Sequence, residues 1–498
     1  MTELIHTISP VLAALTFLVS LGATLYRPLL GAVVIAFVMP LNNFAWHGPV
    51  SVVPWQSALY GFLAGLLGSA TREGGLLRRL YWNRRMSFFA VLLLLSALAG
   101  MLLLPDFANL PDAENWFRSP GGRTVTQLLS LATRVMLVQV AVMSVRRIEN
   151  LQAIFRALLL STALLVLGGA YELLAVRAGL PWMGIIRPEQ GVSGHTASFN
   201  LPAGIAVPRL GSLVGEPKAL AQFLLPILLL SFLMRSMRVA VRGFLASKAF
   251  LAVTLALFVL TFSTSSWLAL VVSAPVVTFI GLRRYFWPVA SGALLVVGAV
   301  AIAAIQGETT LGTIIALRLI EPFRPLQQGV EYLYSYGSVL RGYGSETAAV
   351  LYLLDNPRFL WLGVGPGNGT YHIAPLLSHS LEAIVSVNSG VVRELLEWGV
   401  PGLLAFWWLF FGALREASRV GGKLPHSSAP ARLLWLSMAL MIPVLANDLF
   451  FSSEGSGQVW FYLGILAAST RLGRAHAAAP RTRPAAYAVE QPALALTR

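Results

Sequence analysis

The residues best suited to binding an anion form a short cationic block, Arg209-Leu-Gly-Ser-Leu-Val-Gly-Glu-Pro-Lys218. Gly211 and Gly215 allow the backbone to turn tightly, and Pro217 suits the first turn of the apolar helix that follows. Arg209 and Lys218 are therefore expected just outside the apolar layer, at the depth where the diphosphate of a membrane lipid would lie. The alternative is that both cations only anchor the helix among lipid headgroups.

A second set of reactive side chains lies between residues 306 and 399, a connection of about ninety residues that is too long for a simple loop. This set consists of Arg341, His379, Arg393, Glu394 and Glu397. In a helix, Arg393 and Glu397 share one face at i, i+4, and Glu394 lies beside Glu397 at i, i+3. The carboxylates or the imidazole of His379 are suited to aligning or deprotonating a hydroxyl group. A structural ion pair is the alternative for Arg393 and Glu397.

A third reactive group is Arg134, which lies near the middle of a long apolar run. An arginine at the centre of a membrane costs about 2.5 to 3.5 kcal/mol on insertion scales, so its side chain is expected to face the protein interior or a wet cavity. The alternative is a structural pairing with a buried carbonyl or carboxylate.

Metal and nucleotide chemistry are not indicated. The run Gly363-Val-Gly-Pro-Gly-Asn-Gly369 is not a phosphate loop, because no Lys-Ser or Lys-Thr pair follows it. The candidate loops contain no acidic pair with metal-ligand spacing, so we expect neither a metal nor a cofactor. The chain has no cysteine, which excludes disulfides, thiolate catalysis and iron–sulfur clusters.

The elements that must position these groups are transmembrane helices. Of the 498 residues, 56% are apolar and only 11% are charged, whereas about 25% are charged in soluble proteins. Apolar runs of roughly 16 to 22 residues recur, and each is long enough to cross the hydrocarbon core. The sequence therefore predicts an all-α polytopic membrane protein with about 12–14 transmembrane helices. We place thirteen spans near Ile8–Tyr26, Leu29–Trp46, Val53–Ala70, Met86–Leu104, Val125–Val145, Ile154–Val176, Ala219–Met234, Ala249–Phe262, Trp267–Leu282, Phe286–Ile305, Val400–Ala413, Leu433–Phe450 and Val459–Ala468.

Five regions follow from these spans. We expect an N-terminal transmembrane bundle with an outward loop at 177–218 (1–218), central transmembrane helices (219–305), a large extracytoplasmic loop (306–399), C-terminal transmembrane helices (400–470) and a disordered tail (471–498). The first two segments, separated by Arg27 and Pro28, form either a hairpin of two spans or one span and a re-entrant piece.

The orientation follows from arginine and lysine, which are retained in short cytoplasmic loops. The net charge of +15 is concentrated in such loops, so it indicates topology rather than a nucleic-acid partner. The cations that mark the inside are Arg72, Arg78, Arg79, Arg84, Arg85, Arg146, Arg147, Arg235, Arg238, Arg242, Lys248, Arg283, Arg284, Arg415, Arg419, Lys423 and Arg432. The loops 177–218 and 306–399 are therefore predicted to face outward.

Three blocks in these outward regions resemble the O-antigen polymerase and ligase superfamily. Arg209-x-x-x-x-x-Gly-Glu-Pro-Lys218 resembles the family's Arg-x-x-Gly-x-x-Gly-Asn-Pro-Asn block before a transmembrane helix. Asp355-Asn-Pro-Arg-Phe-Leu-Trp-Leu-Gly-Val-Gly-Pro-Gly-Asn368 is similar to its Asp-His-Pro-to-Gly-x-Gly-x-Asn block. Asn388 through Glu397-Trp-Gly-Val-Pro-Gly402 resembles its His-Asn-to-Glu-x-Gly-x-x-Gly block.

The resemblance implies a GT-C-like, metal-independent glycosyltransferase of the bacterial inner membrane, with its active site facing the periplasm. It would join undecaprenyl-diphosphate-linked oligosaccharide repeat units into an O-antigen, capsule or exopolysaccharide, in contact with membrane lipids and a chain-length regulator. Diphosphate binding would fall to Arg209, Lys218, Arg341 and Arg393, and acceptor activation to Glu397, Glu394 or His379. A ligase that transfers the glycan to another acceptor is the main alternative, and a flippase is a weaker one.

Two departures from the family pattern bear on that alternative. Thr264 replaces an arginine that the family often has before the ninth span. Asn388 stands where the ligase branch has a catalytic histidine, and His379 meets the ligase spacing only in a different register. Because a neutral amide is no general base, these residues favour the polymerase.

Overall fold

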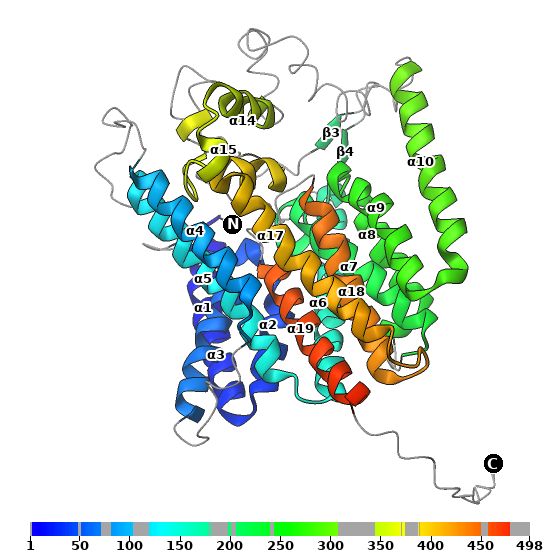
Figure 1. Ribbon diagram of the computed structural model, residues 1–498. Helices are drawn as coiled ribbons and strands as arrows, with labels where there is room; N and C mark the ends of the chain where they lie inside the picture. Colours follow the sequence, from blue (N-terminus) through cyan, green and yellow to red (C-terminus); the bar gives the residue numbers. More distant parts are fainter. Residues whose placement is uncertain are drawn as a thin grey trace, which may run out of the picture.

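The structure is a computed structural model, and it is almost entirely helical (Figure 1). It describes residues 2–47, 51–70, 81–102, 119–178, 180, 198–200, 206–239, 244–306, 344–369, 371–373, 387, 389–449 and 457–478. The α-helices within these ranges are α1 (Thr2–Tyr26), α2 (Pro28–Val38), α3 (Pro54–Ala70), α4 (Arg84–Leu102), α5 (Pro120–Ser144), α6 (Ile148–Ala178), α7 (Pro217–Ser236), α8 (Lys248–Leu260), α9 (Thr264–Gly281), α10 (Phe286–Gln306), α14 (Gly344–Asp355), α15 (Phe359–Leu362), α17 (Gly390–Gly421), α18 (Ala429–Asp448) and α19 (Gly457–Ala478).

Short elements connect these helices. The 3-10 helices are η1 (Asn42–Phe44), η5 (Ser212–Val214), η6 (Phe244–Ala246) and η7 (Arg283–Tyr285). The short strands form two antiparallel pairs. Strand β1 (Trp46–His47) pairs with β2 (Ser51–Val52), and β3 (Ser198–Asn200) pairs with β4 (Ala206–Pro208). No described strand is longer than three residues, so the chain belongs to the all-α class.

Each of the thirteen predicted spans overlaps a described helix, although the bounds differ at several of them. Seven of the described helices are long and apolar enough to cross a membrane by length and composition: α1, α4, α5, α6, α7, α17 and α18. A helix suits this environment because it satisfies every backbone donor and acceptor internally. The structure therefore supports a multi-pass membrane protein.

The second span is shorter than we expected. The sequence predicted Leu29–Trp46, but α2 ends at Val38, just before Pro40, whose ring and missing N–H prevent the helix from continuing. Eleven residues span only about 16 Å, roughly half of the hydrocarbon core. Helix α2 therefore fits the re-entrant piece rather than a complete span.

Serine side chains define where several helices begin. Ser119, Ser247, Ser389 and Ser428 each accept a hydrogen bond from a backbone N–H in the first turn of α5, α8, α17 and α18, respectively. Such caps satisfy N–H groups that have no partner within the helix. Helix α8 begins within one residue of the expected boundary, whereas α5, α17 and α18 begin five, ten and four residues earlier than expected.

Polar contacts tie together the end of the bundle that we expect to face the cytoplasm. Glu416 of α17 pairs with Arg474 of α19 and lies 3.6 Å from Arg85 of α4. Arg471 Nη2 donates to the carbonyls of Val142 and Val145 at the end of α5, at 2.7 and 2.8 Å. Helix α19 thus continues to Ala478, past Arg471, where we expected a disordered tail to begin, because these contacts stabilise its last turns.

Most residues of helices α18 and α19 are buried inside the bundle. Trp460, Phe461 and Tyr462 of α19 are fully buried. Gly464 brings α19 against α5, since a Cβ there would lie only 2.6 Å from the carbonyl oxygen of Val138. Small residues of this kind allow transmembrane helices to approach closely.

Candidate functional site

The cationic block before α7 is hydrogen-bonded to the end of α8. Arg209 Nε donates to the carbonyl of Thr261 at 3.1 Å, and the Leu210 N–H donates to the carbonyl of Leu260, also at 3.1 Å. Arg209 is half-buried, and Lys218 is the second residue of α7 and is also half-buried. The guanidinium is therefore held at the end of α8 by a backbone contact.

A buried carboxylate that we did not single out positions the same block. Glu172 of α6 is 3% exposed, and its Oε2 accepts hydrogen bonds from the N–H groups of Gly211 (3.0 Å) and Ser212 (2.7 Å). Ser212 adopts a φ of 48°, which is unfavourable for a residue with a side chain. An acidic residue within a predicted span was the signal in the sequence, because such residues are rare and have specific partners.

The turn between α8 and α9 continues this polar network. Phe262 has a φ of 47°, which marks a strained turn. The hydroxyl of Ser263 donates to that of Ser266 at 3.3 Å, and Ser266 donates to Asn447 Oδ1 of α18 at 3.0 Å. Thr264, the departure from the family pattern, begins α9 between these serines.

The end of α18 then reaches the start of α17. The Ser389 hydroxyl donates to the carbonyl of Leu449 at 3.0 Å, and its N–H donates to Glu346 of α14 at 3.2 Å. Asp448 is fully buried beside Gly390, where a Cβ would lie 2.5 Å from Asp448 Oδ1. Only glycine therefore allows the first turn of α17 to approach this carboxylate.

The predicted pair of Arg393 and Glu397 exists on α17. Arg393 Nε lies 3.4 Å from Glu397 Oε1, and the side chains are 25% and 8% exposed. Glu397 Oε2 also accepts a hydrogen bond from the Gly367 N–H at 3.0 Å. Glu397 thus joins the arginine to the glycine-rich run, and Glu394, one turn earlier, is fully buried.

The glycine-rich run folds onto α17 rather than around an open anion site. Gly363, Gly365 and Gly367 all have positive φ values, of 70°, 90° and 80°. The N–H groups of Val364 and Gly365 donate to the carbonyls of Leu396 and Glu397 at 2.9 and 3.0 Å. Two of its N–H groups are therefore occupied by helix carbonyls.

The three sequence blocks consequently meet at one end of the bundle. Contacts lead from Glu172 and Arg209 through the α8–α9 turn to α18, and from there to α17 and the glycine-rich run. This end lies opposite the contacts of Glu416 and Arg471.

Arg134, which is 9% exposed on α5, faces the protein interior as expected. Arg341, His379 and Asn388 lie outside the described residues.

A histidine outside the spans has a strongly altered pKa. His372 Nδ1 lies 2.5 Å from the hydroxyl of Tyr352 on α14. Burial, with a smaller contribution from Arg358, lowers the pKa of His372 to about 4, and burial raises the pKa of Tyr352 to about 12. The tyrosine therefore stays protonated and the imidazole stays neutral, which makes this hydrogen bond a structural contact.

Among the residues that the structure describes, no group of three or more His, Asp or Glu side chains is placed to hold a metal ion. In comparisons with known proteins, no family model and no curated protein matches this chain.

Proposed function

We propose that this protein is a membrane glycosyltransferase that polymerises polyprenyl-diphosphate-linked oligosaccharide repeats at the outer end of its bundle. The observation that supports this most is the network joining Arg209, the α8–α9 turn and Arg393. The residues that carry the family resemblance are far apart in the sequence, yet they share one end of the molecule. The inner membrane, with this end facing the periplasm, is the proposed location.

In the proposed reaction, a sugar hydroxyl on one lipid-linked repeat attacks the anomeric carbon of the glycan on another. The new carbon–oxygen bond forms as the bond to the diphosphate breaks, and the hydroxyl proton passes to a base or to water. Negative charge accumulates on the departing diphosphate, and guanidinium groups stabilise it through paired hydrogen bonds. We assign this role to Arg209, Arg393 and Arg341, supported by Lys218.

The contacts of Glu397 favour a positioning role for this residue. Its two carboxylate oxygens lie against Arg393 and the Gly367 N–H, so it orients the arginine and the glycine-rich run. We propose that Glu394 or His379 acts on the acceptor hydroxyl, or that alignment alone activates it.

The experiment that tests this proposal supplies purified enzyme with lipid-linked single repeats and no other acceptor. The wild type should make a ladder of longer lipid-linked chains. Arg209→Ala should lower the rate by about 10²-fold or more, and Arg209→Lys should recover little of it, because lysine keeps the charge but not the planar donor pair. Arg284→Ala, at the opposite end of the bundle, should behave as the wild type.

Two results would overturn the assignment. A normal ladder from Arg209→Ala would make Arg209 an anchor rather than a ligand. Single repeats that stay unextended until a different acceptor is added, and are then transferred to it, would identify a ligase.

A further inference from the structure

A pocket that the sequence did not indicate lies among the outer ends of several helices. It is lined by residues that follow α2, by η1 and η5, by the first turns of α3 and α19 and by the first two turns of α7. The lining includes Trp55, Val214, Gln222 and Gln458, and it contains no charged side chain. A ligand of this pocket is therefore expected to be uncharged.

Gln222 is the residue that points to a ligand. It is 5% exposed and lines the pocket, and its Nε2 has no hydrogen-bond partner among the described residues. Buried amide donors are almost always satisfied, so an orphan that borders a cavity calls for a partner that enters it. That partner must supply an oxygen acceptor.

The other polar groups are ordered and complementary. Gln458 is 4% exposed, and its Nε2 donates to the hydroxyl of the buried Tyr462 at 2.9 Å, which fixes the orientation of its amide. Trp55 is 4% exposed and contributes a large apolar ring to the lining. An amide whose donor is unmatched, a second oriented amide and an indole together suit a molecule with hydroxyl groups and apolar C–H faces.

The early end of α2 creates this pocket. Met39, Pro40 and Asn42, which line it, follow the last turn of α2. Non-helical backbone at membrane depth is tolerated where it is buried in protein or lines a polar cavity. A continuous second span over Leu29–Trp46 would have replaced this irregular lining with helix.

The pocket lies next to the proposed diphosphate site. Lys218 and Gln222 are four residues apart on α7, so they share one face, with Lys218 one turn nearer the outer end. Val214 of the pocket belongs to the block that begins with Arg209. An anion held by that block would therefore place the group attached to it near Gln222.

We propose that this pocket, whose volume is about 30 Å³, receives hydroxyl groups of an uncharged sugar unit of the glycan, the one carried next to the diphosphate. The inference rests on the proposed function for the identity of the glycan, and its chemistry is that of hydroxyl groups bound by Gln222 and Gln458 beside Trp55.

The test measures sugar binding directly in wild-type protein reconstituted in lipid nanodiscs. The nanodiscs avoid detergents with sugar headgroups, which would compete for the pocket. Saturation-transfer NMR is recorded with the methyl glycosides of glucose, galactose, mannose and N-acetylglucosamine, with glycerol as a polyol that lacks a ring. We expect transfer to at least one glycoside and none to glycerol.

The diagnostic variant is Gln222→Met, which keeps the volume and removes the amide. It should weaken glycoside binding about tenfold, as expected for one lost hydrogen bond, and raise KM for lipid-linked repeats similarly, with little change in kcat. The variant should be at least as thermally stable as the wild type, because it removes a buried unsatisfied donor.

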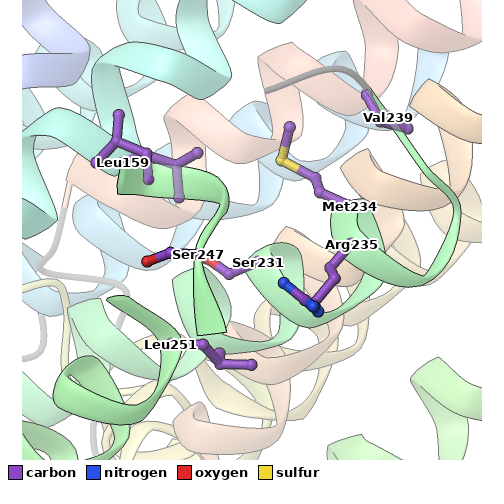
Figure 2. Close-up of a pocket in the computed structure, with 8 residues that line it drawn as sticks. Leu159, Ser231, Met234, Arg235, Val239, Ser247 and Leu251 are labelled. Carbon is purple, nitrogen blue, oxygen red and sulfur yellow. The ribbon is translucent and has the colours of Figure 1, made fainter. Parts of the chain in front are cut away.

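A matched control is available on the same helix. Ser231 also has a buried hydroxyl with no hydrogen-bond partner among the described residues, but it lines a different pocket beside Arg235 and Ser247, toward the other end of α7 (Figure 2). Ser231→Ala should retain wild-type glycoside binding.

The possible outcomes separate this inference from the proposed function. Equal signals from the wild type and Gln222→Met for every glycoside, including no signal from any, would overturn the sugar pocket. So would transfer to glycerol as strong as to the glycosides. Glycoside binding that depends on Gln222 in a protein that makes no ladder would preserve the pocket and refute the polymerase.

Discussion

At the scale of single residues, the polar groups of the site act mainly by holding one another in place. Glu172 and Glu397 each bind a backbone N–H of a glycine in a loop, and both are almost fully buried. A buried carboxylate with such partners orients a loop firmly, because breaking these bonds leaves a costly unpaired charge. These two carboxylates therefore hold in position the segments that carry the cations we assign to the diphosphate.

The contact of Glu397 with Arg393 predicts coupled stability. Glu397→Gln should lower the free energy of unfolding by about 1.5–3 kcal/mol, because hydrogen bonds to charged groups contribute about that much. In a double-mutant cycle with Arg393→Met, measured by unfolding in mixed micelles, we expect a coupling energy of about 0.5–3 kcal/mol. If the stability changes of the two single variants simply added in the double variant, the contact between Glu397 and Arg393 would contribute nothing to stability.

The buried imidazole of His372 predicts a loss of stability in acid. Its pKa is about 4 in the folded protein and about 6.5 when unfolded, so only the unfolded chain binds the proton between these values. The stability that comes from burying a neutral His372 is fully present above pH 6.5. It is lost as the pH falls toward 4, and the free energy of unfolding drops by at most about 1.4 kcal/mol per pH unit.

The check compares the wild type with His372→Gln at pH 7.5, 5.5 and 4.5. The variant keeps an acceptor for Tyr352 but cannot titrate, so the stability difference between the two proteins should shift in favour of the variant in acid. Parallel pH profiles for the two proteins would contradict the burial of a neutral imidazole.

At the scale of elements, glycines decide how the glycine-rich run meets α17. The long helix α17 breaks at Gly399, whose φ is 69°, and the run packs at this break. A Cβ on Gly363 would lie 2.3 Å from the carbonyl oxygen of Glu397, and one on Gly399 would lie 2.8 Å from that of Trp361. The break therefore lets two backbones touch where side chains would separate them.

This packing predicts a difference between two glycines. Gly363→Ala should destabilise the protein by about 1–3 kcal/mol from its positive φ alone, and by more because of the close contact. Gly121→Ala in α5 meets nothing within 4 Å and should be neutral or stabilising by up to about 1 kcal/mol. Thermal unfolding of both variants provides the comparison, and equal losses would show that the run does not pack as described.

At the scale of the whole molecule, the two ends of the bundle have different chemistry. At one end, contacts of arginines with Glu416 and with backbone carbonyls connect the helices. At the other end, the hydrogen-bond network from Arg209 to Glu397 connects them. Since cations are retained in the cytoplasm, the second end should face outward.

This orientation is testable because the natural chain has no cysteine. A single cysteine in place of Leu354, which is 64% exposed on α14, should react with a membrane-impermeant maleimide in cells whose outer membrane is permeabilised. A cysteine in place of the exposed Ser427, between α17 and α18, should react only after the inner membrane is lysed. The reverse pattern would invert the topology and place the proposed site in the cytoplasm.

The sequence by itself indicated where helices lie, because the length of an apolar run does not depend on distant partners. It also predicted the pair of Arg393 and Glu397, whose spacing on one helix is a local property. The early end of α2 was readable in part from Pro40, although the apolar run continued beyond it.

The tertiary structure decided which polar groups meet. The Gly211 N–H donates a hydrogen bond to Glu172, which is 39 residues away in the sequence, and Ser266 donates one to Asn447, which is 181 residues away. It also decided that Gln222 borders a pocket while most of α7 is buried in protein. Such contacts depend on how helices pack, and apolar helix faces in a membrane admit many packings that hydropathy alone does not distinguish.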